Sequence, residues 1–220
     1  MKHPEDFINK VICGDCLEVM KDIPDKSIDL ILTDPPYEIE LSPRNRKWDG
    51  SLNNFDKIKN DEKGFCLKWF KEIERIGKNY IIFGANNFIE SIPKRYGWIV
   101  WDKRLTEKAD KAFGSPFELA ITNKINKYKM YRIQHGGVIN ADSIKGNNEK
   151  RFHPTQKPVI LFSKIVEDFS KEGDLILDPF LGSGTTAIAC KQLKRNFIGI
   201  EISEAYCKIA NQRLKQEILL

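Results

Sequence analysis

The sequence predicts an α/β fold with an open, mostly parallel sheet covered by helices. Short apolar runs with the length of buried strands alternate with longer segments whose apolar residues recur at helical spacing. Several of the apolar runs end directly in an acidic, proline-bearing or glycine-rich turn, the position of ligand-binding loops in such sheets. This alternation is typical of strand–helix–strand units, in which each helix returns the chain to the same end of the sheet.

Length and composition favour one compact domain. The 220 residues are 41% hydrophobic and 30% charged, which is enough for one sizeable core. We therefore expect a single domain over residues 1–220, with a loop at 40–60 and a candidate target-recognition insertion at 103–151. The formal net charge of +5 suits a polyanionic partner without establishing one.

The chain has the features expected of a cytoplasmic protein without a metal. It contains no run of the roughly 18 apolar residues that a membrane span needs, and its start lacks the apolar core of a signal peptide. An odd number of scattered cysteines argues against a disulfide framework: Cys13, Cys16, Cys66, Cys190 and Cys207. Cys13 and Cys16 have CxxC spacing, but no second pair and no closely spaced histidines accompany them, so we expect no zinc site.

In the first half of the chain, short apolar runs alternate with helical spacing. Runs bounded by glycine or proline are typical of buried strands, and apolar residues three or four apart are typical of helices. These patterns predict, in order, a strand at 11–12, a helix at 17–21, a strand at 28–32, a helix at 65–76, a strand at 80–83 and a short helix at 88–92. Gly14 and Asp15 lie at the first strand-to-helix junction.

The second half repeats the pattern around a polar segment. Its predicted elements are strands at 98–101, 117–122 and 128–133, a helix at 159–169, a strand at 175–177, a helix at 187–193, a strand at 197–200 and a last helix that contains residues 205–210. Pro158 suits the first turn of the helix that follows it. Residues 123–151 are rich in Lys, Asn, Gly and Gln and have too little apolar content for a core of their own.

The tetrapeptide Asp34-Pro35-Pro36-Tyr37 follows the predicted strand 28–32 and would lie at the carboxyl edge of the sheet. Two successive prolines restrict the backbone and remove two N–H donors. The Asp34 carboxylate and the Pro35 carbonyl can accept hydrogen bonds from an exocyclic amine, and the Tyr37 ring offers a face on which a base can stack. The pattern predicts a site for an amino-bearing nucleobase, with an ordinary strand-ending turn as the alternative.

A long polar segment, residues 38–60, follows this predicted site. It carries basic residues and Trp48 and has little periodicity. Basic side chains interleaved with an aromatic ring suit contacts with phosphates and bases, although a merely solvated loop is the alternative. The candidate phosphate contacts, here and after the strand 98–101, are Arg44, Arg46, Lys47, Lys103 and Arg104.

A second candidate site begins at Asp178, where the predicted strand 175–177 runs into a glycine-bearing turn and then a helix. The next predicted strand ends in Glu201, 17 residues beyond Gly184. In this arrangement the glycines let the backbone approach a cofactor, and the acid binds its ribose hydroxyls. A nicotinamide dinucleotide is one candidate, but the Asp178 carboxylate would repel its pyrophosphate.

Three segments together resemble the motifs of the amino-methylating DNA methyltransferases. They are the tetrapeptide 34–37, the run His153-Pro154-Thr155-Gln156-Lys157-Pro158 and the run Asp178-Pro179-Phe180-Leu181-Gly182-Ser183-Gly184-Thr185-Thr186. Their order resembles the β group of that family, and the similarity covers nearly the whole chain. It implies a class I, Rossmann-like, doubly wound sheet of seven mostly parallel strands with a reversed hairpin strand. It also implies S-adenosylmethionine as methyl donor and a base flipped out of duplex DNA.

The resemblance also implies a role for individual residues. Asp34 and the Pro35 carbonyl would hold the target amine, Pro36 and Tyr37 would complete the catalytic motif with the Tyr37 ring stacked on the base, and Glu201 would bind the ribose. The other implied cofactor contacts are Asp15 and Cys16 near the adenine, Thr155 and Lys157 near the methionine end, and Asp34, Asp178, Phe180, Gly182, Ser183, Gly184 and Thr185 around the turn.

The same resemblance favours the N6 amine of adenine as the target. In that family an Asp in the first position of the tetrapeptide goes mostly with adenine and a Ser with the N4 amine of cytosine. Ring-carbon methylation would need a cysteine that follows a proline, and none of the five cysteines does. N4-cytosine methylation, RNA methylation and a catalytically inactive DNA-binding module are the alternatives.

Duplex DNA is the expected partner. The candidate recognition insertion is short for the family, which suggests a short target sequence, a homodimer or a helper subunit. A companion restriction enzyme is a further partner that the resemblance suggests.

Overall fold

The computed structural model describes residues 4–36, 65–87, 89, 97–104, 115–133 and 156–216. The strands in these ranges form one eight-stranded sheet in the order β1-β8-β7-β2-β3-β5-β4-β6. They are β1 (Lys10–Cys13), β2 (Leu30–Thr33), β3 (Tyr80–Phe83), β4 (Gly97–Asp102), β5 (Phe117–Thr122), β6 (Tyr128–Arg132), β7 (Leu175–Asp178) and β8 (Asn196–Glu201). The α-helices are α1 (Cys16–Lys21), α2 (Phe65–Ile76), α4 (Val159–Phe169), α5 (Thr185–Gln192) and α6 (Glu204–Lys215), and the 3-10 helices are η1 (Pro4–Phe7) and η2 (Ala85–Asn87).

One strand, β5, runs opposite to the others. It is antiparallel to both β3 and β4, whereas the remaining neighbours pair in parallel. The mostly parallel α/β sheet with a reversed strand is therefore confirmed. The sheet has eight strands rather than seven, because β6 pairs in parallel with β4 and extends that edge.

The expected insertion at 103–151 is partly built into the sheet. It contributes β5 and β6, and β5 lies between β3 and β4 rather than outside them. Residues 105–114 and 134–151, like the loop at 40–60, lie outside the described residues. So does most of the short helix predicted at 88–92. In the described part of the chain, no helix is long and apolar enough to cross a membrane.

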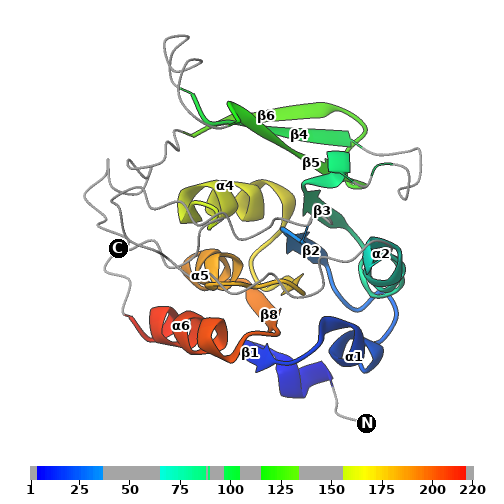
Figure 1. Ribbon diagram of the computed structural model, residues 1–220, viewed down its shortest axis with the longest axis vertical. Helices are drawn as coiled ribbons and strands as arrows, with labels where there is room; N and C mark the ends of the chain where they lie inside the picture. The colour runs from blue at the N-terminus through cyan, green and yellow to red at the C-terminus, as the bar shows by residue number, and fades with distance from the viewer. Residues whose placement is uncertain are drawn as a thin grey trace, which may run out of the picture.

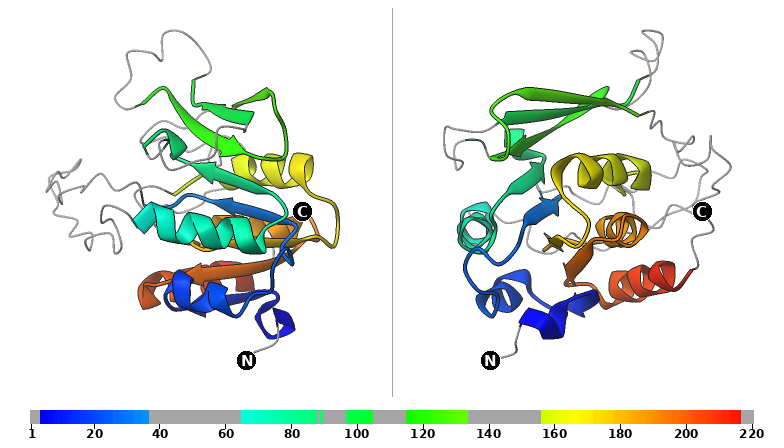
Figure 2. Two further views of the ribbon diagram at one scale, coloured as in Figure 1. Left: turned by 90° about the vertical axis from the view of Figure 1, so that its right-hand side faces the viewer. Right: turned by 180° about the vertical axis from the view of Figure 1, so that it is seen from behind.

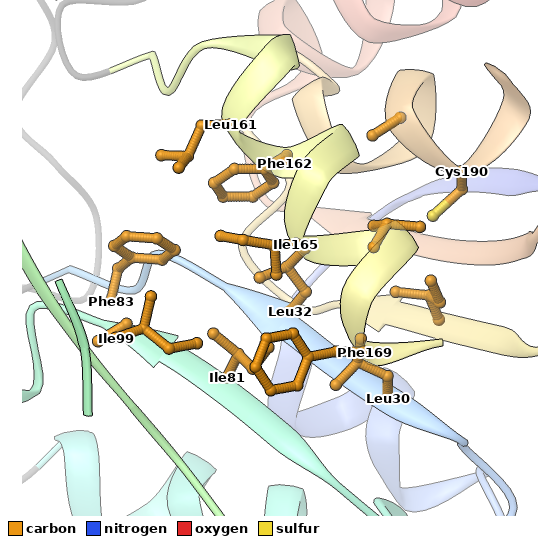
Figure 3. Close-up of a cluster of buried hydrophobic side chains, with 14 of the residues drawn as sticks. Leu30, Leu32, Ile81, Phe83, Ile99, Leu161, Phe162, Ile165, Phe169 and Cys190 are labelled. Atoms are coloured by element: carbon orange, nitrogen blue, oxygen red, sulfur yellow. The ribbon is translucent and has the colours of Figure 1, made fainter. Parts of the chain in front are cut away.

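Helices cover both faces of the sheet: α4, α5 and α6 lie on one side, and α1 and α2 on the other (Figures 1 and 2). The central strands β2, β3 and β7 are consequently buried on both faces. Leu30 and Leu32 of β2 belong to the core under α4, whereas Ile31 belongs to the core under α2. Phe83 of β3 stacks on Phe162 of α4 with ring centroids 5.6 Å apart (Figure 3). This two-sided burial explains why these central strands are nearly continuous apolar runs in the sequence, unlike the edge strand β6.

Candidate active site

The two candidate motifs meet at the adjacent strands β2 and β7. From β2 the chain proceeds outward to β3, and from β7 it proceeds in the opposite direction to β8. Ligands of open α/β sheets bind outside the carboxyl ends of the strands at such a reversal. Asp34 directly follows β2, Asp178 ends β7, and Thr33 Oγ1 donates a hydrogen bond of 2.8 Å to Asp178 Oδ1. Residues more than 140 positions apart in the sequence therefore form one site.

Asp34 is held in place by Lys157, which precedes α4. Lys157 Nζ donates a hydrogen bond to Asp34 Oδ2. The side chain of Lys157 is 7% exposed and that of Asp34 is 17% exposed, so little water separates or screens the two charges. Pro35 is buried and Pro36 is half-buried. This arrangement keeps the carboxylate in one orientation at the end of β2.

Two further charged residues, Glu118 and Lys103, adjoin this pair. Glu118 Oε2 lies 3.1 Å from Lys157 Nζ, and Glu118 Oε1 lies 2.5 Å from Lys103 Nζ. Burial opposes ionisation of Glu118, but the ammonium groups of Lys157 and Lys103 more than offset it and hold the pKa of Glu118 below its usual value. Charges of alternating sign thus extend from Lys103, just after β4, to Asp34, just after β2.

Glu118 was not among the residues predicted from the sequence. It is the second residue of β5, and the start of a parallel strand would lie at the edge opposite the site. Because β5 is antiparallel to its neighbours, its first residues lie at the carboxyl edge instead, where Phe117 pairs with Asp102, the last residue of β4. The reversed strand implied by the resemblance is the signal that could have found Glu118.

Asp178 shapes the glycine turn from inside the protein. Its Oδ1 accepts hydrogen bonds from Thr33 and, at 3.0 Å, from the Phe180 N–H, and its Oδ2 accepts one of 2.5 Å from Thr186 Oγ1. Burial raises the pKa of Asp178 to about 6, and the nearby Asp34 carboxylate acts in the same direction. These three protein donors give Asp178 a role in holding the turn.

The glycines bring the turn close to α6 and to Glu201. Gly182 and Gly184 have φ values of +55° and +92°, which glycine adopts without strain. A Cβ on Gly184 would lie 3.0 Å from Ala210 Cβ of α6, whereas a Cβ on Gly182 would meet nothing within 4 Å. The Gly182 N–H donates a hydrogen bond of 2.8 Å to Glu201 Oε2. Close packing against α6 explains why residue 184 is a glycine. Gly182 differs, because the space beside its backbone is open.

The side chains of Ser183 and Thr185 connect the turn to the segment before α4. Ser183 Oγ lies 3.0 Å from Gln156 Oε1, and Thr185 Oγ1 donates a hydrogen bond of 3.2 Å to the Lys157 carbonyl. The Phe180 ring packs edge-on against Trp69 of α2, with centroids 5.7 Å apart. These contacts fix the turn relative to Lys157 and so relative to Asp34.

Glu201 ends β8 beside the start of α1. Its Oε1 accepts a hydrogen bond of 2.8 Å from the Ser203 N–H, and its backbone carbonyl accepts one of 2.9 Å from the Gly14 N–H. A carboxylate has about four acceptor positions, so those beyond the bonds to Ser203 and Gly182 suit ribose hydroxyls.

Asp15 and Cys16 lie next to Glu201, at the start of α1. Asp15 caps α1, because its Oδ1 accepts a hydrogen bond of 2.8 Å from the Leu17 N–H. Cys16 is buried, and burial raises the pKa of its thiol to about 12. The thiol is therefore neutral and suits an apolar contact.

Of the candidate DNA contacts, Lys103 and Arg104 fall in the described part of the chain. Lys103 pairs with Glu118 and its side chain is 15% exposed, which places it within the charged cluster. Arg104 Nε lies 3.1 Å from Asp102 Oδ1, and the arginine side chain is 32% exposed. The predicted site residues outside the described ranges are Tyr37, Arg44, Arg46, Lys47 and Thr155.

Sequence comparisons agree with the motifs at this edge. A family model described as DNA methylase matches residues 100–212. The chain is 32% identical over 251 residues to the type II methyltransferase M.HinfI of Haemophilus influenzae, covering 96% of this chain and 69% of that protein. It is 31% identical to the type II methyltransferase M.HpaI of Haemophilus parainfluenzae, covering 94% of this chain and 74% of that protein.

Solved structures share the fold. The complex of M1.HpyAVI with SAM (S-adenosylmethionine) has a TM-score of 0.62 and 25% identity and covers 94% of this chain and 99% of that chain. The PvuII DNA methyltransferase, described as cytosine-N4-specific, also has a TM-score of 0.62, at 16% identity, and covers 96% of this chain and 87% of that chain. The second likeness concerns the fold alone. The family match and the two type II relatives show that the chain belongs to the DNA methylase family of N6 and N4 amino methyltransferases.

Proposed function

We propose that this DNA methyltransferase moves a methyl group from S-adenosylmethionine to the N6 amine of an adenine flipped out of duplex DNA. The observation that carries the proposal is the position of Asp34, an oriented acid at the β2–β7 switch point beside the glycine turn. An acceptor for an amine and a turn suited to a nucleoside cofactor thus lie at one edge of the sheet.

The residues at this edge fit S-adenosylmethionine. When bound, this cofactor supplies a methyl group on a positively charged sulfur. Carboxylates at the edge favour a cation and disfavour a pyrophosphate, which argues against a dinucleotide. Glu201 has acceptor positions for ribose hydroxyls, and the open space at Gly182 lets a ligand approach the backbone. The similarity to the SAM complex of M1.HpyAVI supports the same cofactor.

Asp34 and Pro35 would orient the target amine. The amine lone pair is delocalised into the base, and hydrogen bonds from its two N–H groups to the Asp34 carboxylate and the Pro35 carbonyl would localise the lone pair on nitrogen. The same carboxylate stabilises the positive charge that develops on that nitrogen. Positioning of this kind lowers the barrier without a covalent enzyme intermediate.

Three buried thiols are unsuited to a covalent mechanism. Burial raises the pKa of Cys16 and of Cys207 to about 12, and it raises the pKa of Cys190 as well. A protonated thiol is a poor nucleophile. Direct displacement at the methyl carbon, which needs no thiol, is the mechanism that we propose.

Adenine is the proposed base because the tetrapeptide begins with Asp34. N4-cytosine methylation is the second candidate, since the cytosine-N4-specific PvuII enzyme matches the fold with a TM-score of 0.62. The fold alone does not separate the two amines.

Radiolabelled methyl transfer to duplex DNA, with matched RNA and nucleoside analysis of the product, tests the proposal. We expect N6-methyladenine in DNA; N4-methylcytosine would overturn the choice of base, and transfer to RNA alone would overturn the substrate. Asp34→Ala should abolish transfer and keep DNA binding in a mobility-shift assay. Asp25→Ala, at an exposed acid paired with Arg75, is the control that keeps both. Equal loss of transfer and DNA binding in Asp34→Ala would contradict the assigned role.

Phosphate contacts by Arg44, Arg46 and Lys47, and by the partly exposed Arg104, are part of the same proposal. Lys103 is the least suited of the original candidates, because Glu118 already holds its ammonium group. A companion restriction enzyme is consistent with the type II relatives M.HinfI and M.HpaI.

A further inference from the structure

Glu118 occupies a position that the motifs of the active site do not explain. Each of its carboxylate oxygens faces a different lysine, with Oε1 2.5 Å from Lys103 Nζ and Oε2 3.1 Å from Lys157 Nζ. The Lys157 side chain is 7% exposed, and it contacts Asp34 with the same Nζ that contacts Glu118. Lys157 therefore lies between Glu118 and Asp34, the proposed amine acceptor.

The charge of Lys157 opposes the proposed chemistry unless another group balances it. An ammonium group beside Asp34 weakens the attraction of that carboxylate for the amine hydrogens. It also repels a positively charged methyl donor at the same edge of the sheet. In a poorly hydrated site such repulsion is weakly screened. A second carboxylate next to Lys157 restores the balance, and Glu118 is in that position.

The topology of the sheet places Glu118 beside Lys157. β5 is the reversed strand, so its first residues lie at the carboxyl edge of the parallel strands. The pairing of Glu118 with Trp101 near the end of β4 brings it within reach of Lys103, and Lys103 Nζ also lies 4.9 Å from the centre of the Trp101 ring. Held between two lysines, the Glu118 carboxylate has a fixed orientation toward Lys157.

We propose that Glu118 is a positioning residue that balances the charge of Lys157 and keeps the site receptive to a positively charged methyl donor. The inference rests on the proposed function of the same site. S-adenosylmethionine and its product S-adenosylhomocysteine differ by one methyl group and one positive charge. The negative charge of Glu118 therefore favours the donor over the neutral product when the two compete for the site.

Binding of the two ligands to the full chain, measured by titration calorimetry without DNA, tests the inference. In Glu118→Gln, a loss of one negative charge should weaken binding of S-adenosylmethionine on the order of tenfold and change binding of S-adenosylhomocysteine by less than about twofold. Lys103→Met removes a positive charge from the same cluster and should shift the preference in the opposite direction. Asp168→Asn is the matched control, because it removes an acid paired with Lys129 at 2.7 Å, at the far end of α4.

A purely structural role predicts a different pattern. If Glu118 only ties β5 to the segment before α4, Glu118→Gln should weaken the binding of both ligands equally. Lys103→Met should then not increase the preference for the donor. Either result overturns the inference. If Glu118→Gln does not fold, the direction of the shift in Lys103→Met decides alone. A wild-type protein that binds neither ligand would overturn the proposed function and the inference together. A wild-type protein that methylates DNA but shows no opposite shifts would overturn the inference alone.

Discussion

Replacement of Asp178 by asparagine should stabilise the protein above pH 6. Asp178 is buried, and its pKa is raised from 3.8 to about 6, mainly by burial. Because the folded pKa exceeds the unfolded one, the folded state binds more protons between these values. The stability that this group contributes is therefore present below about pH 4 and is lost as the pH rises through about 6.

The expected size follows from the shift. At about 1.4 kcal/mol per pKa unit, ionisation of Asp178 costs about 3 kcal/mol of unfolding free energy at pH 8. Asparagine has nearly the same shape, cannot ionise and can still accept a hydrogen bond from Thr33 or the Phe180 N–H. For a chain of this size, the change corresponds to a rise in Tm of roughly 6–12 °C.

Thermal unfolding of wild type and Asp178→Asn at pH 4 and pH 8 measures the effect. The two proteins should have similar Tm values at pH 4, where Asp178 is largely protonated in the folded state, and the variant should have the higher Tm at pH 8. Asp29→Asn is the contrasting control. Burial opposes ionisation of Asp29, but the hydrogen bonds from Lys78 and the Leu175 N–H lower its pKa. Removal of the Asp29 carboxylate should therefore destabilise the protein at pH 8. Equal destabilisation of Asp178→Asn at both pH values would refute the reasoning, because hydrogen bonding would then outweigh ionisation.

Two further outcomes are expected. Gly184→Ala should lower the unfolding free energy by about 1–3 kcal/mol in urea titrations, because a Cβ at φ +92° would lie 3.0 Å from Ala210 Cβ. Gly182→Ala, with open space around its Cβ, should lower the unfolding free energy by less. Equal losses of unfolding free energy in the two variants would contradict the packing argument. The logarithm of the DNA affinity, measured by fluorescence anisotropy, should fall steeply and linearly with the logarithm of the salt concentration. A joint substitution of Arg44, Arg46 and Lys47 by alanine should make this slope shallower. An unchanged slope would exclude these residues as phosphate contacts.

Local patterns account for the elements that were predicted well. The run around residues 28–32 is apolar at every position because β2 is buried on both faces, with Leu30 and Leu32 on one side and Ile31 on the other. The helix α2 has its apolar residues on one face, among them Trp69 and Ile73. Such periodicities are visible in a single segment, since each residue reports the environment of its own side chain.

Contacts between distant segments account for what was missed. The pairing of Lys157 with Asp34 joins residues separated by 123 positions, and neither segment alone indicates it. The bonds that Asp178 accepts from Thr33 and Thr186 also hold the turn, and the bond from Thr33 of the neighbouring strand cannot be inferred from the motif alone. Glu118 went unnoticed because its importance depends on the direction of β5.

The sequence by itself determined the fold class, the positions of the strands and the family, because periodic burial and the strand-ending motifs are local properties of the chain. Only the tertiary structure decided the strand order, which of the strands is reversed and the place of β6 beside β4 at the edge of the sheet. These follow from long-range pairing, which leaves no periodic signal in either partner. The same pairing brings Glu118, Lys157 and Asp34 together, so the charge balance of the site was decided by the tertiary fold.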